Sequence, residues 1–137
     1  MKLLLLSIFL LLFSACETKH ITKQNETNSF IDFHNSEVNC AHCSMAVSDK
    51  NYAAQLQLKD QRALFFDDIG CLLLWKKKNP SQKTTNEWIF SLDTQKWIKA
   101  NHAFYQGGDT TPMGFGYGAY EKAPNPHISY AVLKERF

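Results

Sequence analysis

Two cysteines, a histidine and a methionine lie close together between positions 40 and 45 of the sequence. Cys40 and Cys43 form a C-x-x-C motif, His42 lies between them, and Met45 follows two positions after Cys43. Thiolate and thioether sulfurs are soft donors, and a site that combines them favours Cu(I) over hard cations such as Mg²⁺. The spacing therefore predicts a soft-metal site, with these four residues as candidate ligands.

A C-x-x-C motif by itself is also typical of two other functions. A structural zinc site would use Cys40, Cys43, Cys71 and one histidine, whereas a thiol–disulfide oxidoreductase would need only Cys40 and Cys43. Met45 favours copper, because neither zinc binding nor disulfide exchange requires a thioether. The plain structural interpretation makes Met45 a core side chain at the start of a strand. We keep zinc and disulfide chemistry as alternatives.

A second methionine stands in the glycine- and proline-rich segment Gly107–Gly114. This composition predicts a shaped loop, because Pro112 fixes its own φ and Gly114 lets the backbone turn directly afterwards. Met113 lies between them. It could serve as a thioether ligand, contact a partner protein or fold back as a hydrophobic plug.

The chain begins with a segment that is typical of a bacterial lipoprotein signal peptide, residues 1–15. Lys2 precedes an apolar run, Leu3–Phe13, that is shorter than the ~20 residues needed to cross a bilayer. Two small residues then lead into Cys16, which we expect to be lipidated and to become the mature N-terminus. This predicts anchoring on the periplasmic side of a bacterial membrane, with ordinary secretion as the alternative.

After the leader, the sequence predicts a polar tether over 16–37 and a folded domain over 38–137. An apolar patch in the tether, Phe30–Phe33, is expected to touch the domain. The domain could also consist of two small lobes, about 38–80 and 86–137.

Charge and motifs exclude several function classes. The chain has 15 basic and 13 acidic residues, and no basic run alternates with aromatic residues, which argues against a nucleic-acid partner. The sequence contains no recognisable catalytic triad, paired-carboxylate site or phosphate loop. We therefore predict a binding protein and not an enzyme.

Alternation of apolar and polar residues over Ala53–Asp60 predicts a half-buried strand, and Ala63–Phe66 is expected to pair back as a hairpin. Asp68 is a suitable N-cap for a helix from Ile69 to about Asn79, which Pro80 ends. Cys71 would lie in the first turn of this helix, where the helix dipole lowers a thiol's pKa, although burial is the favoured interpretation.

A second strand–turn–strand pattern covers Glu87–Leu92 and Trp97-Ile98, and His127–Arg136 is predicted to be a helix. Together these elements predict an α+β fold of small antiparallel β-hairpin units with one or two helices. The two hairpins are similar, so the unit could be duplicated.

Three separated motifs are Cys40-x-x-Cys43-Ser44-Met45, Phe66-Asp67-Asp68-Ile69-Gly70-Cys71 and Thr111-Pro112-Met113-Gly114. With the lipoprotein-like leader, they resemble the NosL family, copper-binding lipoproteins that help to assemble the copper sites of nitrous-oxide reductase. The resemblance implies a small α+β fold with ββαβ-type units, and Cu(I) as cargo. It also implies delivery to a periplasmic copper enzyme or its assembly machinery.

Carried over by position, the resemblance implies that Cys43, Met45 and Met113 are the main ligands. Cys40 would be an additional ligand, a transient carrier or half of a disulfide with Cys43. The sequence departs from the family pattern at two places. Ser44 stands where glycine is common, and the histidine that often follows the first cysteine is displaced by one position, to His42.

Overall fold

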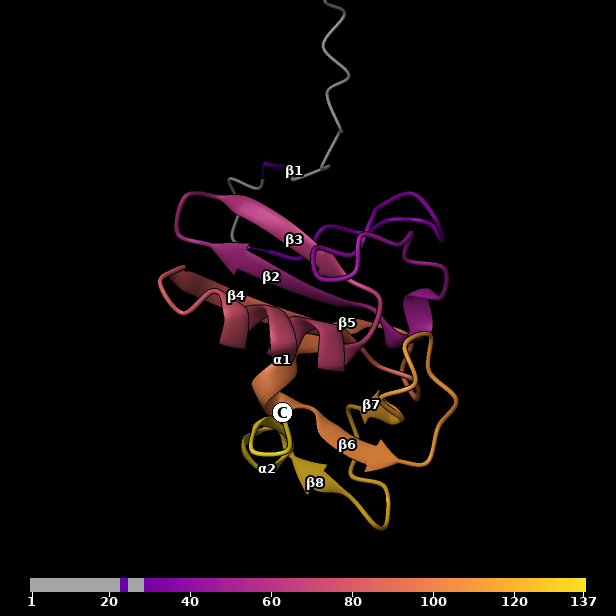
Figure 1. Ribbon diagram of the computed structural model, residues 1–137. Helices are drawn as coiled ribbons and strands as arrows, with labels where there is room; N and C mark the ends of the chain where they lie inside the picture. The colour runs from indigo at the N-terminus through magenta and orange to yellow at the C-terminus, as the bar shows by residue number, and fades with distance from the viewer. Residues whose placement is uncertain (1–22, 25–28) are drawn as a thin grey trace, which may run out of the picture.

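The structure, a computed structural model, describes residues 23–24 and 29–137 (Figure 1). The predicted signal peptide and the predicted lipidation site, Cys16, lie outside these residues. Within the described part of the chain, no helix has both the length and the apolar character needed to cross a bilayer.

The larger of two sheets has five antiparallel strands in the order β1-β3-β2-β4-β5 (Figure 1). The helix α1 follows β3 and packs against β2 and β3. The succession β2, β3, α1, β4 is the predicted ββαβ unit, and the predicted α+β class is confirmed. The bounds are β1 Lys23–Gln24, β2 Ala54–Leu58, β3 Arg62–Phe66, α1 Ile69–Lys78, β4 Thr84–Phe90 and β5 Trp97–Lys99.

The second sheet has three antiparallel strands in the order β7-β6-β8, followed by the short helix α2. This half is therefore built differently from the ββαβ unit. Because β4 and β5 complete the first sheet, the two sheets divide after Lys99, later than the lobe boundary that the sequence suggests. The bounds are β6 Phe104–Gly107, β7 Tyr117–Tyr120, β8 Ile128–Ser129 and α2 Tyr130–Lys134, with 3₁₀ turns η1 Lys50–Tyr52 and η2 Ala100–His102.

Strand β2 is buried on both faces, whereas its alternating sequence predicts one exposed face. The two polar residues Gln55 and Gln57 are buried because residues 29–33 cover them. The amide of Gln55 accepts from the Ile31 N–H (2.9 Å) and donates to the Ile31 carbonyl (2.6 Å), and Gln57 Nε2 donates to the Ser29 carbonyl (2.6 Å). These bonds satisfy polar groups that would otherwise be costly to bury.

Aromatic packing attaches the same segment to the domain. Phe33 is buried, with its ring centroid 5.3 Å from that of Phe65 and 5.7 Å from that of Trp97. The packed part of the chain therefore includes residues 29–37, which the sequence assigned to the tether. The contact predicted for the apolar patch Phe30–Phe33 is present, and together with the hydrogen bonds of Gln55 and Gln57 it holds the segment in place.

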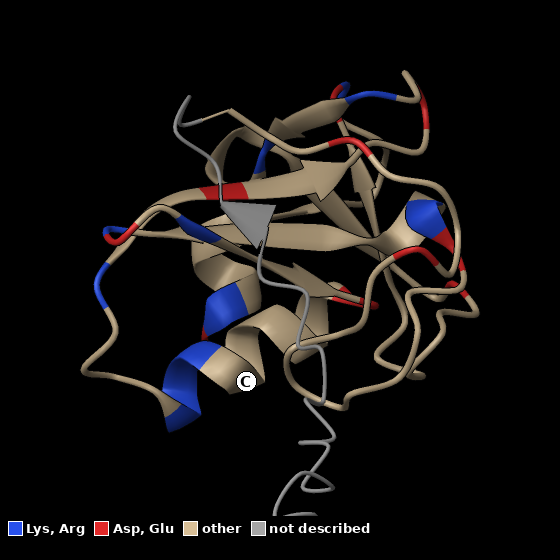
Figure 2. Cartoon of the chain, turned by 90° about the horizontal axis from the view of Figure 1, so that it is seen from above, with Lys and Arg blue, Asp and Glu red and all other residues tan. Residues whose placement is uncertain are grey.

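Helix α1 begins where the sequence predicts. The side chain of Asp68 accepts from the Gly70 N–H (3.2 Å), which satisfies one of the free donors of the first turn. Three lysines, Lys76–Lys78, occupy the last turn, where positive charge complements the helix dipole (Figure 2). As a result, Cys71 is placed in the first turn of α1, a short way after the end of β3 at Phe66.

Candidate metal centre

The residues from Asn39 to Ala46 form a tight loop that is closed by backbone hydrogen bonds. The Cys40 N–H donates to the Met45 carbonyl (2.8 Å), and the Ser44 N–H donates to the Cys40 carbonyl (2.9 Å). Ser44 has a φ of 66°, in the left-handed region that glycine adopts most readily. The glycine that the resembled motif commonly has at this position would therefore suit the same turn.

This loop, Asn39–Ala46, lies beside the end of strand β3. Cys40 forms a parallel bridge with Phe65, and the Ala41 N–H donates to the Phe65 carbonyl (2.8 Å). Because β3 leads directly into α1, the loop is held next to the first turn of that helix. Two segments that are separated in the sequence thus meet at one point.

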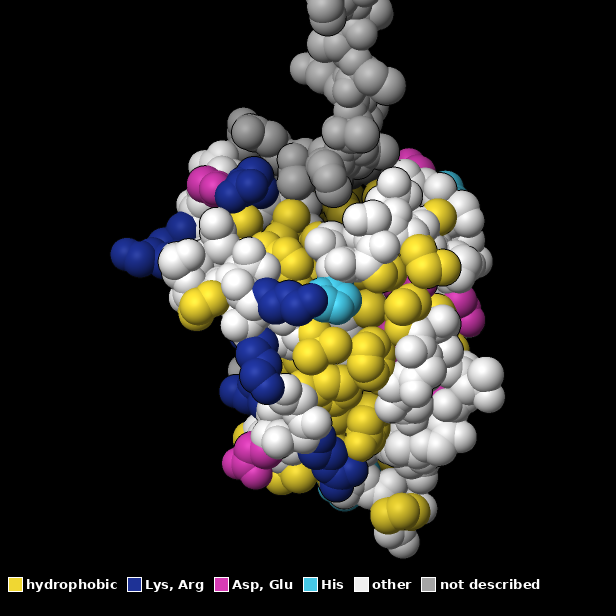
Figure 3. All heavy atoms as spheres, viewed as in Figure 1, with side chains coloured by type: hydrophobic (Ala, Val, Ile, Leu, Met, Phe, Trp, Pro, Cys, Tyr) yellow, Lys and Arg dark blue, Asp and Glu magenta, His cyan; other side chains and the backbone are white. Residues whose placement is uncertain are grey.

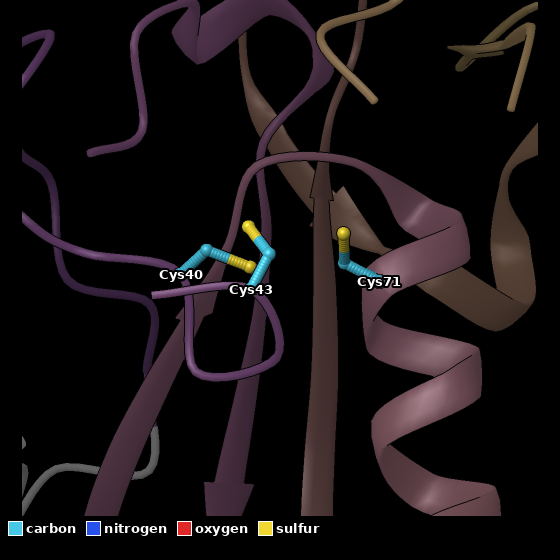
Figure 4. A group of neighbouring side chains, drawn as sticks. All are labelled: Cys40, Cys43 and Cys71. Carbon is cyan, nitrogen blue, oxygen red and sulfur yellow. The ribbon is translucent and has the colours of Figure 1, made fainter. Parts of the chain in front are cut away.

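Three cysteine sulfurs converge at this point (Figure 4). The sulfurs of Cys40, Cys43 and Cys71 all lie within 4.8 Å of one another, and all three are free thiols. Cys40 and Cys71 are buried, whereas Cys43 is half-buried and closer to solvent. We call these three residues the thiol cluster. Across residues 23–24 and 29–137, no histidine or carboxylate joins it.

The thiol cluster contains one acidic thiol. A hydrogen bond from Cys71, assisted by backbone N–H groups of Cys43, Asp67 and His42, lowers the pKa of Cys40 to about 5. The same hydrogen bond, together with burial, raises the pKa of Cys71, and burial raises the pKa of Cys43. At neutral pH the cluster therefore holds one thiolate, on Cys40, and two protonated thiols.

We expect the reduced, metal-free protein to show one thiolate ionisation near pH 5, followed by its ultraviolet absorbance. Cys40→Ser should remove this step, and Cys71→Ala should move it upward, because the hydrogen bond from Cys71 is lost. The depressed pKa also means that the Cys40 thiolate contributes stability that is complete above the unfolded pKa and is lost as pH falls through about 5. A first ionisation near the ordinary thiol value of about 8.5 would contradict this expectation.

The other predicted ligands in this loop, Met45 and His42, differ in their exposure to solvent. Met45 is 57% exposed on the loop, so it is not the core side chain of the simpler interpretation. His42 is half-buried in the same loop and lies outside the thiol cluster. Cys71, which sequence reasoning placed in the core and in the zinc alternative only, belongs to the cluster.

Met113 lies in the central pair of a four-residue turn, Thr111–Gly114, which the Gly114 N–H closes on the Thr111 carbonyl (3.0 Å). Directly after this turn, Phe115 packs against Gly70 in the first turn of α1; a Cβ on Gly70 would lie 2.3 Å from the Phe115 ring. The loop that carries the half-buried Met113 thus lies over the same helix turn as Cys71. Glycine and proline predicted the shape of this loop but not its position.

The fold and the thiol cluster define a small α+β domain in which a loop, a strand end and a helix start bring three sulfurs together. Among solved structures, the chain is similar to the copper chaperone NosL from Shewanella denitrificans. The TM-score is 0.57 and the identity 16%, over 68% of this chain and 79% of the other. At this identity the likeness shows the fold, and at that level the resemblance predicted from the motifs is confirmed. No protein-family model and no curated protein matches the chain.

Proposed function

We propose that this chain is a copper-binding accessory protein that carries Cu(I) on Cys40, Cys43 and Cys71 and passes it to a copper-dependent enzyme. The observation that carries the proposal is the convergence of the three sulfurs within 4.8 Å of one another. Thiolates are soft ligands that suit monovalent copper. The Cys40 thiolate is present at neutral pH, so an incoming cation meets a negatively charged donor.

The composition of the thiol cluster favours copper over structural zinc. Structural zinc sites are almost always tetrahedral and closed by four protein ligands. Within the described part of the chain, the cluster offers three sulfurs and no histidine or carboxylate as a fourth partner. A low-coordinate Cu(I) site does not need that fourth protein ligand.

The accessibility of the thiols argues against a disulfide oxidoreductase. Such an enzyme needs an attacking thiolate that its substrate can reach. Here the acidic thiol, Cys40, is only 1% exposed, whereas the more accessible Cys43 has a raised pKa. The thiolate is therefore on buried Cys40, whereas Cys43, which a substrate could reach more easily, carries a protonated thiol.

Transfer would begin on the solvent side of the thiol cluster. Cys43 is half-buried, and Met45, two residues later, is well exposed. A soft ligand from an acceptor protein could bind the copper there while Cys43 leaves and takes up a proton, which its raised pKa favours. Because Cys43 and Cys71 must lose protons when copper binds, affinity should fall as pH falls.

We further propose that the protein is anchored through a lipid on Cys16 at the periplasmic side of a bacterial membrane and is not an enzyme. Its acceptor would be a copper enzyme such as nitrous-oxide reductase, or the machinery that assembles one. The lipoprotein-like leader supports the anchor, and the fold shared with a copper chaperone supports the transfer role.

The test is anaerobic Cu(I) binding to the reduced protein without its leader, in competition with the chromophoric chelator bicinchoninate. We expect one copper per chain, with protection of the thiols from alkylation, and much weaker binding after Cys43→Ser. A parallel titration with zinc provides the comparison. Zinc that binds at the cluster and is required for folding, with no comparable Cu(I) binding, would overturn the proposal.

A further inference from the structure

A single buried residue connects the helix turn that carries Cys71 to the loop that carries Met113. Asp68 is fully buried, and its backbone carbonyl accepts the Cys71 N–H (3.0 Å). One oxygen of its carboxylate caps the Gly70 N–H, and the other accepts a hydrogen bond from the Thr111 hydroxyl. Asp68 thus bonds to both segments at once.

Thr111 occupies a corresponding position on the loop side. Its side chain is buried, donates to Asp68 and also accepts from the Gly116 N–H (3.0 Å). The same Gly116 closes the base of the loop, because its carbonyl accepts the N–H groups of Gly108 (2.9 Å) and Asp109 (3.2 Å). The Thr111 hydroxyl therefore connects the start of the turn that contains Met113 to Asp68 and to Gly116, which follows the turn.

The hydrogen bonds of the Asp68 carboxylate to Gly70 and Thr111 are buried, so losing either costs more than losing a surface contact of the same geometry. Removing the Thr111 hydroxyl would leave one oxygen of the buried Asp68 carboxylate without that partner, and unsatisfied buried acceptors are costly. The loop would then rely on Phe115, whose ring lies against Gly70 and 5.4 Å from the ring of Phe137.

We propose that Asp68 and Thr111 are positioning residues of the copper site, which hold the thioether of Met113 ready to cover copper on the thiol cluster. This inference rests on the proposed function. We call the hydrogen bond between the two residues the Asp68–Thr111 latch. The latch slows the loss of copper from the site. A preorganised ligand binds more tightly because its ordering cost has already been met. Opening of the latch would withdraw the thioether and hasten copper release.

The experiment is a double-mutant cycle on the copper-loaded protein, with the rate of Cu(I) loss to excess bicinchoninate as the readout. Thr111→Val keeps the shape of the side chain but removes the hydroxyl, and Met113→Leu removes only the thioether. Outer contacts of metal sites are commonly worth ~10–100-fold, so we expect Thr111→Val to release copper faster by about that factor, and Met113→Leu, which removes the thioether itself, by at least as much. The double variant should release copper no faster than Met113→Leu alone.

Thr111→Ser is the matched control, because it keeps the hydroxyl and should retain slow release. Additive effects of the two substitutions, or release from Thr111→Val at the wild-type rate, would overturn the inference. A general loss of folding would instead accelerate release equally with and without Met113, and would therefore appear as additivity.

A metal-free measurement keeps this result separate from the proposed function. Hydrogen exchange of reduced Thr111→Val should rise in residues 108–116 while the core of β2 stays protected. If the wild type binds no Cu(I), both proposals fall. If it binds Cu(I) through the cysteines but neither loop exchange nor release depends on Thr111, only the latch is refuted.

Discussion

Replacing Cys71 with alanine should lower Cu(I) affinity by more than about 100-fold, because a direct ligand matters more than the outer contacts that are typically worth 10–100-fold. The substitution removes one of three sulfurs that lie within 4.8 Å of one another. It also removes the hydrogen bond that holds the pKa of Cys40 near 5, so less thiolate is present at neutral pH. Competition with bicinchoninate at fixed pH would measure the change.

The size of this effect separates two versions of the site. In the version favoured by the sequence, the ligands are Cys43, Met45 and Met113, and Cys71 is only a buried core residue. The matched comparison is Met45→Leu, which alters an exposed side chain on the loop and leaves the thiol cluster intact. Wild-type affinity in Cys71→Ala, combined with a large loss in Met45→Leu, would restore the sequence-based version.

Replacing Gly70 with alanine should destabilise the protein, although alanine is the better helix former. The added Cβ would lie 2.3 Å from Cγ of Phe115, which is too close for any real contact. Overpacking of this kind typically costs about 1–3 kcal/mol, whereas the gain in helix propensity is at most ~1 kcal/mol. We therefore expect a net loss in the free energy of unfolding, measured by urea denaturation.

A second substitution tests the cause of that loss. Phe115→Ala should be destabilising alone, but in combination with Gly70→Ala it should cost much less than the sum, because the clash is gone. Contacting residues commonly show coupling of about 0.5–3 kcal/mol. Strictly additive effects, or a Gly70→Ala protein more stable than the wild type, would mean that the loop over α1 does not pack against Gly70.

Features that depend on neighbouring residues could be predicted from the sequence. The N-cap Asp68 and the helix that follows it were predictable, since capping and helix formation act within a few positions. The hairpin of β2 and β3 and the turn around Met113 were predictable for the same reason. The C-x-x-C spacing likewise indicated Cys40 and Cys43 as a pair.

The place of Cys71 beside Cys40 and Cys43 could not be predicted from neighbouring residues in the sequence. Burial was the favoured prediction, and Cys71 is indeed completely buried. Burial did not indicate that its neighbours would be Cys40 and Cys43, however. That proximity depends on the bridge between Cys40 and Phe65, which joins a loop to the end of a strand far along the chain. Hydrophobicity shows that a thiol is inside the protein but not which side chain it faces there.

Packing of the whole chain sets which polar groups are buried and which distant segments they connect. Gln55 and Gln57 have the pattern of an exposed strand face, yet the segment from residue 29 covers them and satisfies their amides. Asp68 and Thr111 bond across 43 positions of the chain. Local composition encodes turns and helices, whereas the partner of a buried polar group is set by how the whole chain packs.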